Sequence, residues 1–593
     1  MHRVAGAAAI IFLGNVASRV LGLVRELVIA ALFGATGATS AYRTAAQLAT
    51  QAYDLLISGA ISAALVPVFT DYADAPDRRA FARVVSVVLN LLLLALGIVL
   101  LALGVAAPWL VRLLGADPRY ADLTVTLTRF ALVSVFFLGV AGVVTAALYA
   151  RRDFKWPALA TAAYNLGIIV AALVLTPLWP ASAGETRIVA LAIGLVLGAL
   201  LQAAVQLPGL RDVRYQPLLD WHHPGVRRAL RLYAPVVAGL VVTNVGVGWY
   251  LYLAWQAGPD ALATLGFATN LVQFPLGLVA SAVSLAALPT LARAAADLTP
   301  PSPPFPRREG GEPVQPATGA VPVLPEAEPL PADLTVPPFL DRNEDAGQAE
   351  ASAPPSLRGK GAGGLGHPNY AATLTFAMRL VLLLILPATA GLIALREPAV
   401  ALLFQRGAFD ADATRHTAAA FFWFSPQLPF AALDQLFIVA FYARKDTRTP
   451  VLVGVGTVLL YIVTAPALCG CVDLPLLGRP PVAGLGNGLA FANAIQNSTH
   501  AVVLYLLLRR LFPGIGGGGL GGFVLRVGLA ALVMGLALAW ALPLLRAMGL
   551  GVAAQVLVAG ALGAIIYAAL LALLRVREAA LLWEQIVERL RRK

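Results

Sequence analysis

Residues 6–33 read GAAAIIFLGNVASRVLGLVRELVIAALF, an apolar stretch that is long enough to cross a bilayer as a helix. One glycine and five polar residues recur along it: Asn15, Ser18, Arg19, Gly22, Arg25 and Glu26. At about 100° per residue these positions fall within about 120° of one another on a helix. A charge at the centre of a bilayer costs at least about 2.5–3.5 kcal/mol, so this face should turn away from lipid. It lines a polar transport cavity, or it forms a buried Arg–Glu pair that only holds helices together.

The whole chain has the composition of a membrane protein. Its 593 residues are 59% hydrophobic and 12% charged, with a mean hydropathy of +0.79, whereas a soluble domain carries about 25% charged residues. The net charge of +12 comes from short loops between apolar stretches, which is typical of membrane orientation and not of nucleic-acid binding. No spacing of Cys and His indicates a metal site, and we expect no cofactor and no nucleic-acid partner.

Apolar stretches of membrane-spanning length recur throughout the sequence and predict an all-α protein with about fourteen transmembrane helices. They lie near residues 6–33, 41–68, 84–112, 122–149, 157–176, 187–208, 231–256, 262–292, 371–395, 416–442, 450–468, 484–508, 521–545 and 550–574. With the N-terminus in the cytoplasm, the inner loops and the C-terminal tail carry about three times as many Lys and Arg residues as the outer loops. We therefore expect both termini to be cytoplasmic.

Two segments differ in kind from the apolar stretches. Residues 295–368 are rich in Pro, Gly and Ala without an apolar period, so we expect a disordered cytoplasmic insertion. It is a tolerated insertion or a regulatory docking site. Residues 576–593 alternate apolar and charged residues at helical spacing, which predicts a cytoplasmic amphipathic tail on the anionic lipids of the inner leaflet. The alternative is a frayed polar end.

Two pairs of related segments indicate an internal repeat. Tyr149-Ala-Arg-Arg-Asp-Phe-Lys-Trp-Pro157 is echoed by Tyr442-Ala-Arg-Lys-Asp-Thr-Arg-Thr-Pro450, and Leu65-Val-Pro67 by Ala287-Leu-Pro289. Two six-helix repeats of the same orientation are typical of parallel-repeat transporters, whose substrate site lies between the lobes. We divide the chain into an N-terminal lobe (1–210), a C-terminal lobe (211–294 and 369–510) and two added helices (511–575).

Polar residues also mark the first two predicted helices of each repeat. The second helix carries a stripe of Arg43, Gln47, Gln51, Asp54, Ser58 and Ser62, with Tyr53 on an adjoining face. The seventh and eighth helices carry Thr243, Asn244, Asn270 and Gln273. One shared cavity accounts for all of these positions. Arginine binds phosphate oxygens through a planar fork of donors, so an anionic, phosphate-bearing cargo is favoured over a cation.

Asp434 is a separate candidate, since it is a carboxylate inside the tenth predicted helix. Such a residue is a usual proton or cation site in coupled transporters. The alternative is a carboxylate that is hydrogen-bonded to Gln435 or to a neighbouring helix.

Five motifs resemble the MurJ (MviN) lipid II flippases of the MOP exporter superfamily. They are Ser18-Arg-Val-Leu-Gly-Leu-Val-Arg-Glu26, Ala60-Ile-Ser-Ala-Ala-Leu-Val-Pro-Val-Phe69, Phe274-Pro-Leu-Gly277 with Leu288-Pro289, Leu403-Phe-Gln-Arg-Gly-Ala-Phe409, and Phe441-Tyr-Ala-Arg-Lys-Asp-Thr-Arg-Thr-Pro450. The resemblance spans nearly the whole chain except the insertion. It implies a V-shaped, alternating-access transporter of the bacterial cytoplasmic membrane. Apart from the resemblance, no cluster of acids, histidines or metal ligands is visible in the predicted loops, so we do not expect an enzyme. The implied cargo is lipid II, the undecaprenyl-pyrophosphate-linked peptidoglycan precursor, moved from the inner to the outer leaflet.

The resemblance also implies that the last two helices form a groove for the lipid tail, and that cell-wall synthesis machinery is a partner. In the family, cavity arginines on the first, second and eighth helices are associated with the pyrophosphate. Arg19 and Arg25 match, whereas the second-helix position is Tyr53 and the eighth-helix position is Asn270. Two acidic family positions correspond to Ser40 and Gln273. The candidate binding residues are Ser18, Arg19, Arg25, Glu26, Arg43, Tyr53, Asp54, Asn270 and Gln273.

These departures leave the cargo open. Arg43 lies on the same face as Asp54, about three turns earlier, and is placed to compensate in part for a missing arginine. The alternatives to lipid II transport are a flippase for another lipid-linked oligosaccharide, a non-transporting scaffold for envelope assembly, and a cation-coupled exporter of small molecules that uses Asp434.

Overall fold

The computed structural model of the chain describes residues 2–58, 64–73, 78–280, 370–470 and 486–580, with isolated residues at 283, 284, 287, 290, 291, 293, 294 and 584. Every regular element in these ranges is a helix. Nine of the described helices are long and apolar enough to cross a membrane. The chain is therefore a multi-pass, all-α membrane protein, as the composition indicates. The expected number of fourteen spans stays a prediction.

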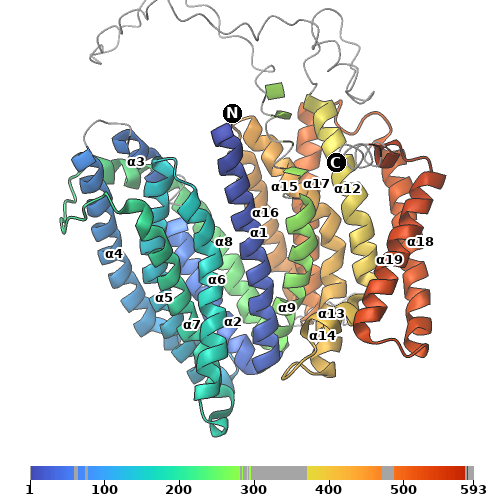
Figure 1. The fold of residues 1–593 in the computed structure, drawn as a ribbon, viewed down its shortest axis with the longest axis horizontal. Coiled ribbons are helices and arrows are strands. Elements are labelled where there is room, and N and C mark those ends of the chain that lie inside the picture. The colour runs from blue at the N-terminus through green and yellow to red at the C-terminus, as the bar shows by residue number, and fades with distance from the viewer. Residues whose placement is uncertain are drawn as a thin grey trace, which may run out of the picture.

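The first half of the chain forms a bundle on one side of the molecule (Figure 1). Its helices are α1 (His2–Phe33), α2 (Gly37–Tyr53), α3 (Val66–Ala73), α4 (Arg78–Leu113), α5 (Pro118–Ala150), α6 (Lys155–Leu175) and α7 (Val189–Gln206). A π-helical turn, η1 (Asp54–Ser58), continues α2. Helix α1 packs on α6, and α5 packs on both α2 and α7.

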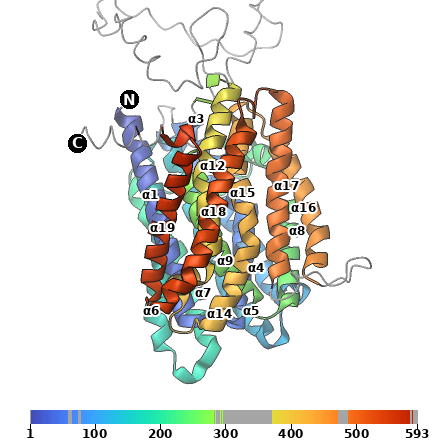
Figure 2. The same cartoon turned by 90° about the vertical axis from the view of Figure 1, so that its right-hand side faces the viewer.

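The second half forms the other side of the molecule. Its helices are α8 (Pro224–Ala257), α9 (Ala261–Pro275), α12 (Tyr370–Ala394), α13 (Arg396–Phe404), α14 (Ala411–Phe424), α15 (Leu428–Ala443), α16 (Arg448–Leu468) and α17 (Asn487–Leu511). A second π-helical turn, η6 (Leu276–Ala280), follows α9, and a 3-10 turn, η8 (Ser425–Gln427), joins α14 to α15. The added helices α18 (Leu520–Ala547) and α19 (Val552–Leu573) pack on each other and on α12 at the outer edge (Figures 1 and 2).

The two halves repeat one another in backbone detail. In the paired motifs, Arg152 and Lys445 both adopt a left-handed conformation with φ of 60°. The amide of the next residue, Asp153 or Asp446, donates to a carbonyl five residues earlier, at 2.9 and 3.1 Å. When Pro67 is aligned with Pro289, the π-helical turns η1 and η6 also fall at matching positions. The predicted pair of parallel repeats is confirmed.

Helix α8 connects the two lobes, and its two ends pack on different helices. Val226 is buried in a cluster with residues of α3, α4 and α5, including Phe69 and Phe81. Just before α8, Asn90 of α4 donates to the carbonyls of Gln216 and Leu218 at 3.1 and 2.9 Å. Further along, α8 packs on α16 and α9. The lobe boundary at residue 210 stays a prediction, and these contacts place the change of neighbours within α8.

The two segments that differ in kind are described only in part. The insertion at residues 295–368 lies outside the described residues, as does most of the tail. At the start of the tail Val576 is buried, and Glu578 forms an ion pair with Arg379 of α12 at 2.6 Å. The tail therefore begins docked on the protein, and contact of its remainder with anionic lipids stays a prediction.

Candidate functional site

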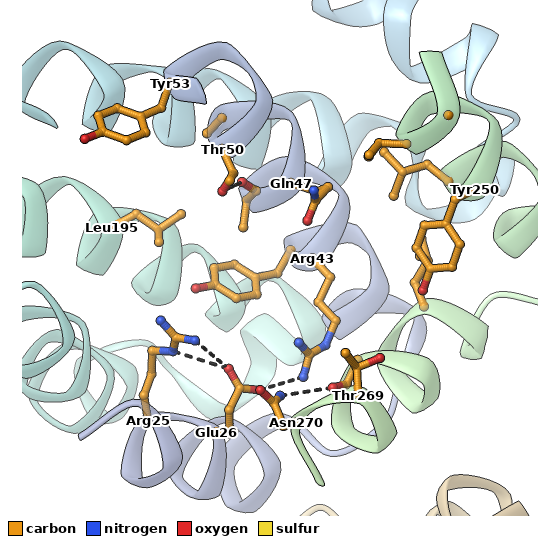
Figure 3. A pocket seen from close by; sticks show the side chains of 18 of the residues that line it. Arg25, Glu26, Arg43, Gln47, Thr50, Tyr53, Leu195, Tyr250, Thr269 and Asn270 are labelled. Atoms are coloured by element: carbon orange, nitrogen blue, oxygen red, sulfur yellow. Dashed lines mark hydrogen bonds and ion pairs between the residues drawn. The ribbon is translucent and has the colours of Figure 1, made fainter. Parts of the chain in front are cut away.

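A cavity of about 750 Å³ lies between the two halves of the molecule. Its walls come from α1, α2, α5, α6 and α7 of the first half and from α8, α9, α14, α16 and α17 of the second. Figure 3 shows the side chains that point into it. One space shared by both repeats is what the distribution of polar residues in the sequence predicts.

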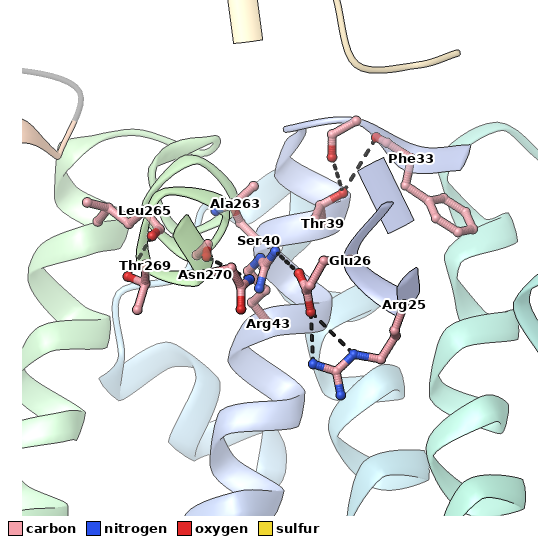
Figure 4. A network of polar contacts seen from close by, with 12 residues as sticks. Arg25, Glu26, Phe33, Thr39, Ser40, Arg43, Ala263, Leu265, Thr269 and Asn270 are labelled. Atoms are coloured by element: carbon pink, nitrogen blue, oxygen red, sulfur yellow. Dashed lines mark hydrogen bonds and ion pairs between the residues drawn. The ribbon is translucent and has the colours of Figure 1, made fainter. Parts of the chain in front are cut away.

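A charged triad of Arg25, Glu26 and Arg43 forms the first-repeat wall of this cavity (Figures 3 and 4). Glu26 Oε1 accepts from Arg25 Nη2 at 2.9 Å and from Nε at 3.3 Å, and Glu26 Oε2 accepts from Arg43 Nη2 at 2.7 Å. The side chain of Glu26 is 4% exposed, whereas those of Arg25 and Arg43 are 27% and 18% exposed. The guanidinium groups therefore face the cavity and share one carboxylate behind them.

A second layer of polar groups holds Arg25 in place. Arg25 Nη1 donates to Asn165 Oδ1 of α6 at 3.0 Å. The amide nitrogen of Asn165 donates in turn to the carbonyl of Ser18 at 3.3 Å and to that of Thr161 at 3.1 Å. Ser18 thus lies behind the cavity wall, where it helps to orient Arg25 through Asn165.

Arg43 reaches from α2 to α9, across the interface between the repeats. Its Cζ lies 4.5 Å from the ring centroid of Phe267, in a cation–π contact. A Cβ atom at Gly266 would come within 2.5 Å of the same Cζ, so the guanidinium lies directly on a glycine surface. Among the described residues, Arg43 Nε is buried and has no hydrogen-bond partner. Arg43 thus links the first-repeat wall of the cavity to α9 of the second repeat.

The remaining candidate residues separate into two groups. Tyr53 and Asn270 line the cavity. Arg19, Asp54 and Gln273 are not among its lining residues. Arg19 is exposed and lies against Gly277 of η6, where an added Cβ would overlap its guanidinium, and Gln273 is exposed.

The cavity also has lining residues that the sequence reasoning missed. Asn493 and Gln496 of α17, together with Tyr250 of α8 and Tyr461 of α16, make the second-repeat wall polar but uncharged. Tyr461 is 3% exposed, and its hydroxyl has no hydrogen-bond partner in the part of the chain that the structure describes. The amide residues at helical spacing near the start of α17 were the available signal for this wall.

Asp434 lies outside the cavity lining and is bonded to a neighbouring helix. Its Oδ1 is 2.6 Å from Nδ1 of His500, which is inside α17. The other ring nitrogen of His500 is 3.2 Å from the carbonyl oxygen of Pro450 at the start of α16. His500 was missed, since nothing in the sequence pairs it with Asp434. An ion-coupling role for Asp434 stays a prediction.

The lobes are joined near the end of α1 that is predicted to face outside. The amide of Ala408 donates to the carbonyl of Ala31 at 2.9 Å, and Gly34 and Gly407, both at positive φ, allow this close approach. Ser40 of α2 accepts from the amide of Ala263 at 3.1 Å. Thr44 accepts from Trp255 Nε1 at the same distance. These contacts close the predicted outer side.

Asp260, in the turn between α8 and α9, belongs to the same closed end. Burial raises the pKa of its carboxyl above the ordinary value, although Arg119 of the first repeat acts in the opposite direction. The proton affinity of this carboxyl therefore depends on how closely the two repeats approach each other.

The family model described as "Lipid II flippase MurJ" matches residues 29–301 and 365–560. The chain belongs to the MurJ family. It is 27% identical to "Lipid II flippase MurJ" of Burkholderia cenocepacia over 503 residues. This alignment covers 83% of this chain and 81% of that protein. It is 26% identical over 504 residues to "Probable lipid II flippase MurJ" of Haemophilus influenzae, with 82% and 83% coverage.

Solved structures agree with the MurJ assignment at the level of the fold. A MurJ structure in an inward closed conformation superposes with a TM-score of 0.67 at 18% identity, covering 94% of this chain and 98% of that one. An inward-facing MATE family transporter of the MOP superfamily superposes with a TM-score of 0.59 at 14% identity, covering 83% and 94%. The predicted MurJ family and MOP-type architecture are confirmed. The family match begins at Ile29, so the role of the polar face at residues 18–26 depends on the geometry described above.

Proposed function

We propose that the chain is a lipid II flippase, which moves the polyprenyl-pyrophosphate-linked peptidoglycan precursor from the inner to the outer leaflet of the cytoplasmic membrane. The observation that carries this proposal is the charged triad on the wall of an interlobe cavity in a MurJ-family fold. The activity requires no covalent step, so we propose a transporter and not an enzyme.

The charge of the triad favours an anionic headgroup. Arg25 and Arg43 share one carboxylate, which leaves an excess positive charge among helices that span the bilayer. An excess charge at this depth is costly unless a counter-ion neutralises it. Guanidinium groups bind phosphate oxygens through two parallel donors, and the side chains of Arg25 and Arg43 are 27% and 18% exposed at the cavity. A pyrophosphate supplies both the charge and the acceptors.

The closed outer side supports a route that begins in the cytoplasm. The headgroup would enter the cavity from the inner side while the isoprenoid tail stays in lipid, along a groove that we assign to α18 and α19. Rocking of the lobes about the cavity would then break the Ala31–Ala408 contact and open the outer side. The membrane potential acts on any charge carried across, at about 2.3 kcal/mol per charge per 100 mV. We place both termini in the cytoplasm, with anionic lipids and cell-wall synthesis machinery as partners.

Replacement of Arg25 tests the proposal. Arg25→Ala should abolish complementation of a flippase-depleted bacterial cell and strongly lower leaflet exchange of lipid II in proteoliposomes, while membrane insertion is unchanged. Arg25→Lys keeps the charge but loses the paired donors, so it should recover part of the activity. Full activity of Arg25→Ala at normal expression would contradict phosphate binding by α1.

A flippase for another polyprenyl-linked glycan is the second candidate, because Tyr53 and Asn270 occupy positions where the family resemblance implies arginines. The lipid that copurifies with the protein, and that is lost in Arg25→Ala, identifies the cargo. No exchange of any polyprenyl-linked lipid would favour a scaffold. Efflux of a small organic cation that does not depend on Arg25 would favour an exporter.

A further inference from the structure

The contact between Asp434 and His500 joins three helices of the second repeat at a single imidazole ring. Nδ1 of His500 lies 2.6 Å from Asp434 of α15, and Nε2 lies 3.2 Å from the carbonyl oxygen of Pro450 in α16. The side chains of His500 and Asp434 are 14% and 19% exposed. We call Asp434 and His500 the Asp–His pair.

The partners of the ring determine how many protons the pair holds. A carbonyl oxygen and an ionised carboxylate are both acceptors, and a neutral imidazole has one N–H donor. Both contacts are hydrogen bonds only if His500 is doubly protonated beside an ionised Asp434, or if Asp434 is protonated beside a neutral His500. Each state has one proton more than neutral His500 beside ionised Asp434. Loss of this proton turns one of the two bonds into a contact between lone pairs.

A polar stripe along α17 connects the Asp–His pair to the cavity. Asn493 and Gln496 line the cavity, and His500 follows one turn later on the same helix. Between them, the Asn497 side chain donates to Asn493 Oδ1 at 3.0 Å and also to Gln427 of η8. The orientation of α17 therefore affects both the pair and the cavity wall.

The following ionisable groups on the surrounding helices have other partners or are exposed. Tyr370 of α12 donates to a backbone carbonyl of α15 at 2.7 Å, and Arg379 of α12 pairs with Glu578 of the tail. Tyr505 of α17 packs on a phenylalanine ring of α15, and Arg448 of α16 is exposed. Tyr461 of α16 lines the cavity, and Asp412, Arg415 and His416 lie in the first turns of α14. In the hydrogen bonds of the described residues, the pair is bonded to itself and to Pro450.

The first repeat contains a neutral counterpart of the pair. Alignment of the paired YAR motifs places Ala141 opposite Asp434. The side chain of Gln206, on α7, donates to the carbonyl of Ala141 at 3.5 Å and accepts from Thr145 of α5 at 2.7 Å. The same helix pairing is therefore bridged by a group that does not titrate.

We propose that the Asp–His pair is a proton-binding site of the second repeat, and that its proton is exchanged as the lobes change conformation. The site binds a proton from water on one side of the membrane and releases it when movement of α16 or α17 separates His500 from Pro450 or Asp434. This inference rests on the proposed flippase function for its role in transport. Whether the Asp–His pair holds this extra proton does not depend on which lipid is carried.

The protonation state can be measured on the full-length protein in lipid nanodiscs. Selective ¹⁵N labelling of histidine reports on both ring nitrogens, and the signal that disappears in His500→Gln is assigned to His500. We expect this signal at neutral pH to show two N–H groups, or one N–H group with a carboxylic acid on Nδ1. In Asp434→Asn the extra proton should be absent. A neutral imidazole beside an ionised Asp434 in the wild-type protein would overturn the inference.

Transport provides the second arm of the experiment. Lipid II exchange in proteoliposomes should respond to an imposed pH gradient, and Asp434→Asn and His500→Gln should each reduce this response at least about 10-fold, equivalent to 1.4 kcal/mol. Gln206→Leu, which breaks the neutral counterpart, should keep the response. Absence of all exchange would count against the proposed flippase while leaving the ¹⁵N result intact. If lipid II exchange by the wild-type protein does not respond to the pH gradient, the proposed coupling of proton binding to transport is refuted.

Discussion

The two repeats supply walls of opposite character to the same cavity. Alignment of Pro67 with Pro289 places Arg25, Glu26 and Arg43 opposite Val247, Gly248 and Leu265. The backbone is common to both repeats, down to a π-helical turn after α2 and after α9. The charges are confined to the first repeat, whereas the second contributes amides and phenols. A duplicated scaffold can therefore become a directional binding site when polar residues are placed in one copy only.

In the matching helix bridges away from the cavity, the ionisable groups lie in the second repeat, and the first repeat has an uncharged amide instead. The first repeat bridges α5 and α7 through the amide of Gln206, and the second bridges α15 and α17 through His500 and Asp434. The first repeat thus supplies arginines that can bind an anion in the cavity. The second repeat supplies the titratable Asp–His pair outside the cavity lining. The division separates cargo binding from proton binding in space.

The largest effect should follow from removing the carboxylate of the charged triad. Glu26 is 3% exposed, and Glu26→Ala would leave Arg25 and Arg43 without a counter-charge. Loss of one partner of a buried ion pair costs about 3–5 kcal/mol. Thermal unfolding in nanodiscs should show a marked loss of stability, whereas Gly248→Ala, at the matching position of the second repeat, should show none. Equal stability of both variants would mean that the triad carries little interaction energy.

Moving a charge from one wall to the other tests whether position matters beyond net charge. Arg25→Ala should lower lipid II exchange by about 10–100-fold, as expected for the loss of a charged hydrogen bond worth about 1.5–3 kcal/mol. Adding Val247→Arg restores the net positive charge of the cavity, but on the second-repeat wall. Asn165 and Glu26, which orient Arg25, belong to the first repeat. Exchange should stay low in the double variant. Recovery would show that the cavity requires charge but not a particular wall.

The glycine surface under Arg43 gives a smaller effect with a matched control. Gly266→Ala places a Cβ within 2.5 Å of Arg43 Cζ and should displace the guanidinium, with a destabilisation of about 1–3 kcal/mol. At Gly248 no heavy atom lies within 4 Å of an added Cβ, so Gly248→Ala should be neutral or slightly stabilising. Chemical denaturation and lipid II exchange measure both variants. Similar behaviour of the two would contradict the contact between Arg43 and α9.

The smallest effect concerns pH at the closed end. Because burial raises the pKa of Asp260, the closed form binds a proton there more tightly than the open form does. The closed form is therefore favoured at low pH, and this preference is lost as the pH rises through the raised pKa. The effect should be below about 1 kcal/mol, since the site is partly solvated. Fluorescence energy transfer between labels on the outer ends of the two lobes should report this opening, and Asp260→Asn should abolish its pH dependence. A pH response unchanged in Asp260→Asn would assign the effect to another group.

Much of the site could be predicted from helical periodicity alone. The polar face of α1 placed Arg25 and Glu26 correctly at the cavity, and the stripe on α2 did the same for Arg43. Asp54 is not among the lining residues, although its neighbour Tyr53 is, and the π-helical turn that begins at Asp54 changes the phase of the positions that follow it. Asn165 and His500 were missed for another reason. Each acquires its role from a partner that is distant in the chain.

The sequence by itself determined the membrane class, because bilayer thickness and the exclusion of charge from lipid constrain every apolar stretch independently. Its recurring motifs indicated the repeated architecture and the family. The tertiary structure alone decided which polar groups share the cavity and which are bonded behind it. That choice depends on the packing of one helix on another, as in the contact of Arg43 with Gly266 and of His500 with Asp434. Periodicity within a single helix contains no information about such partners.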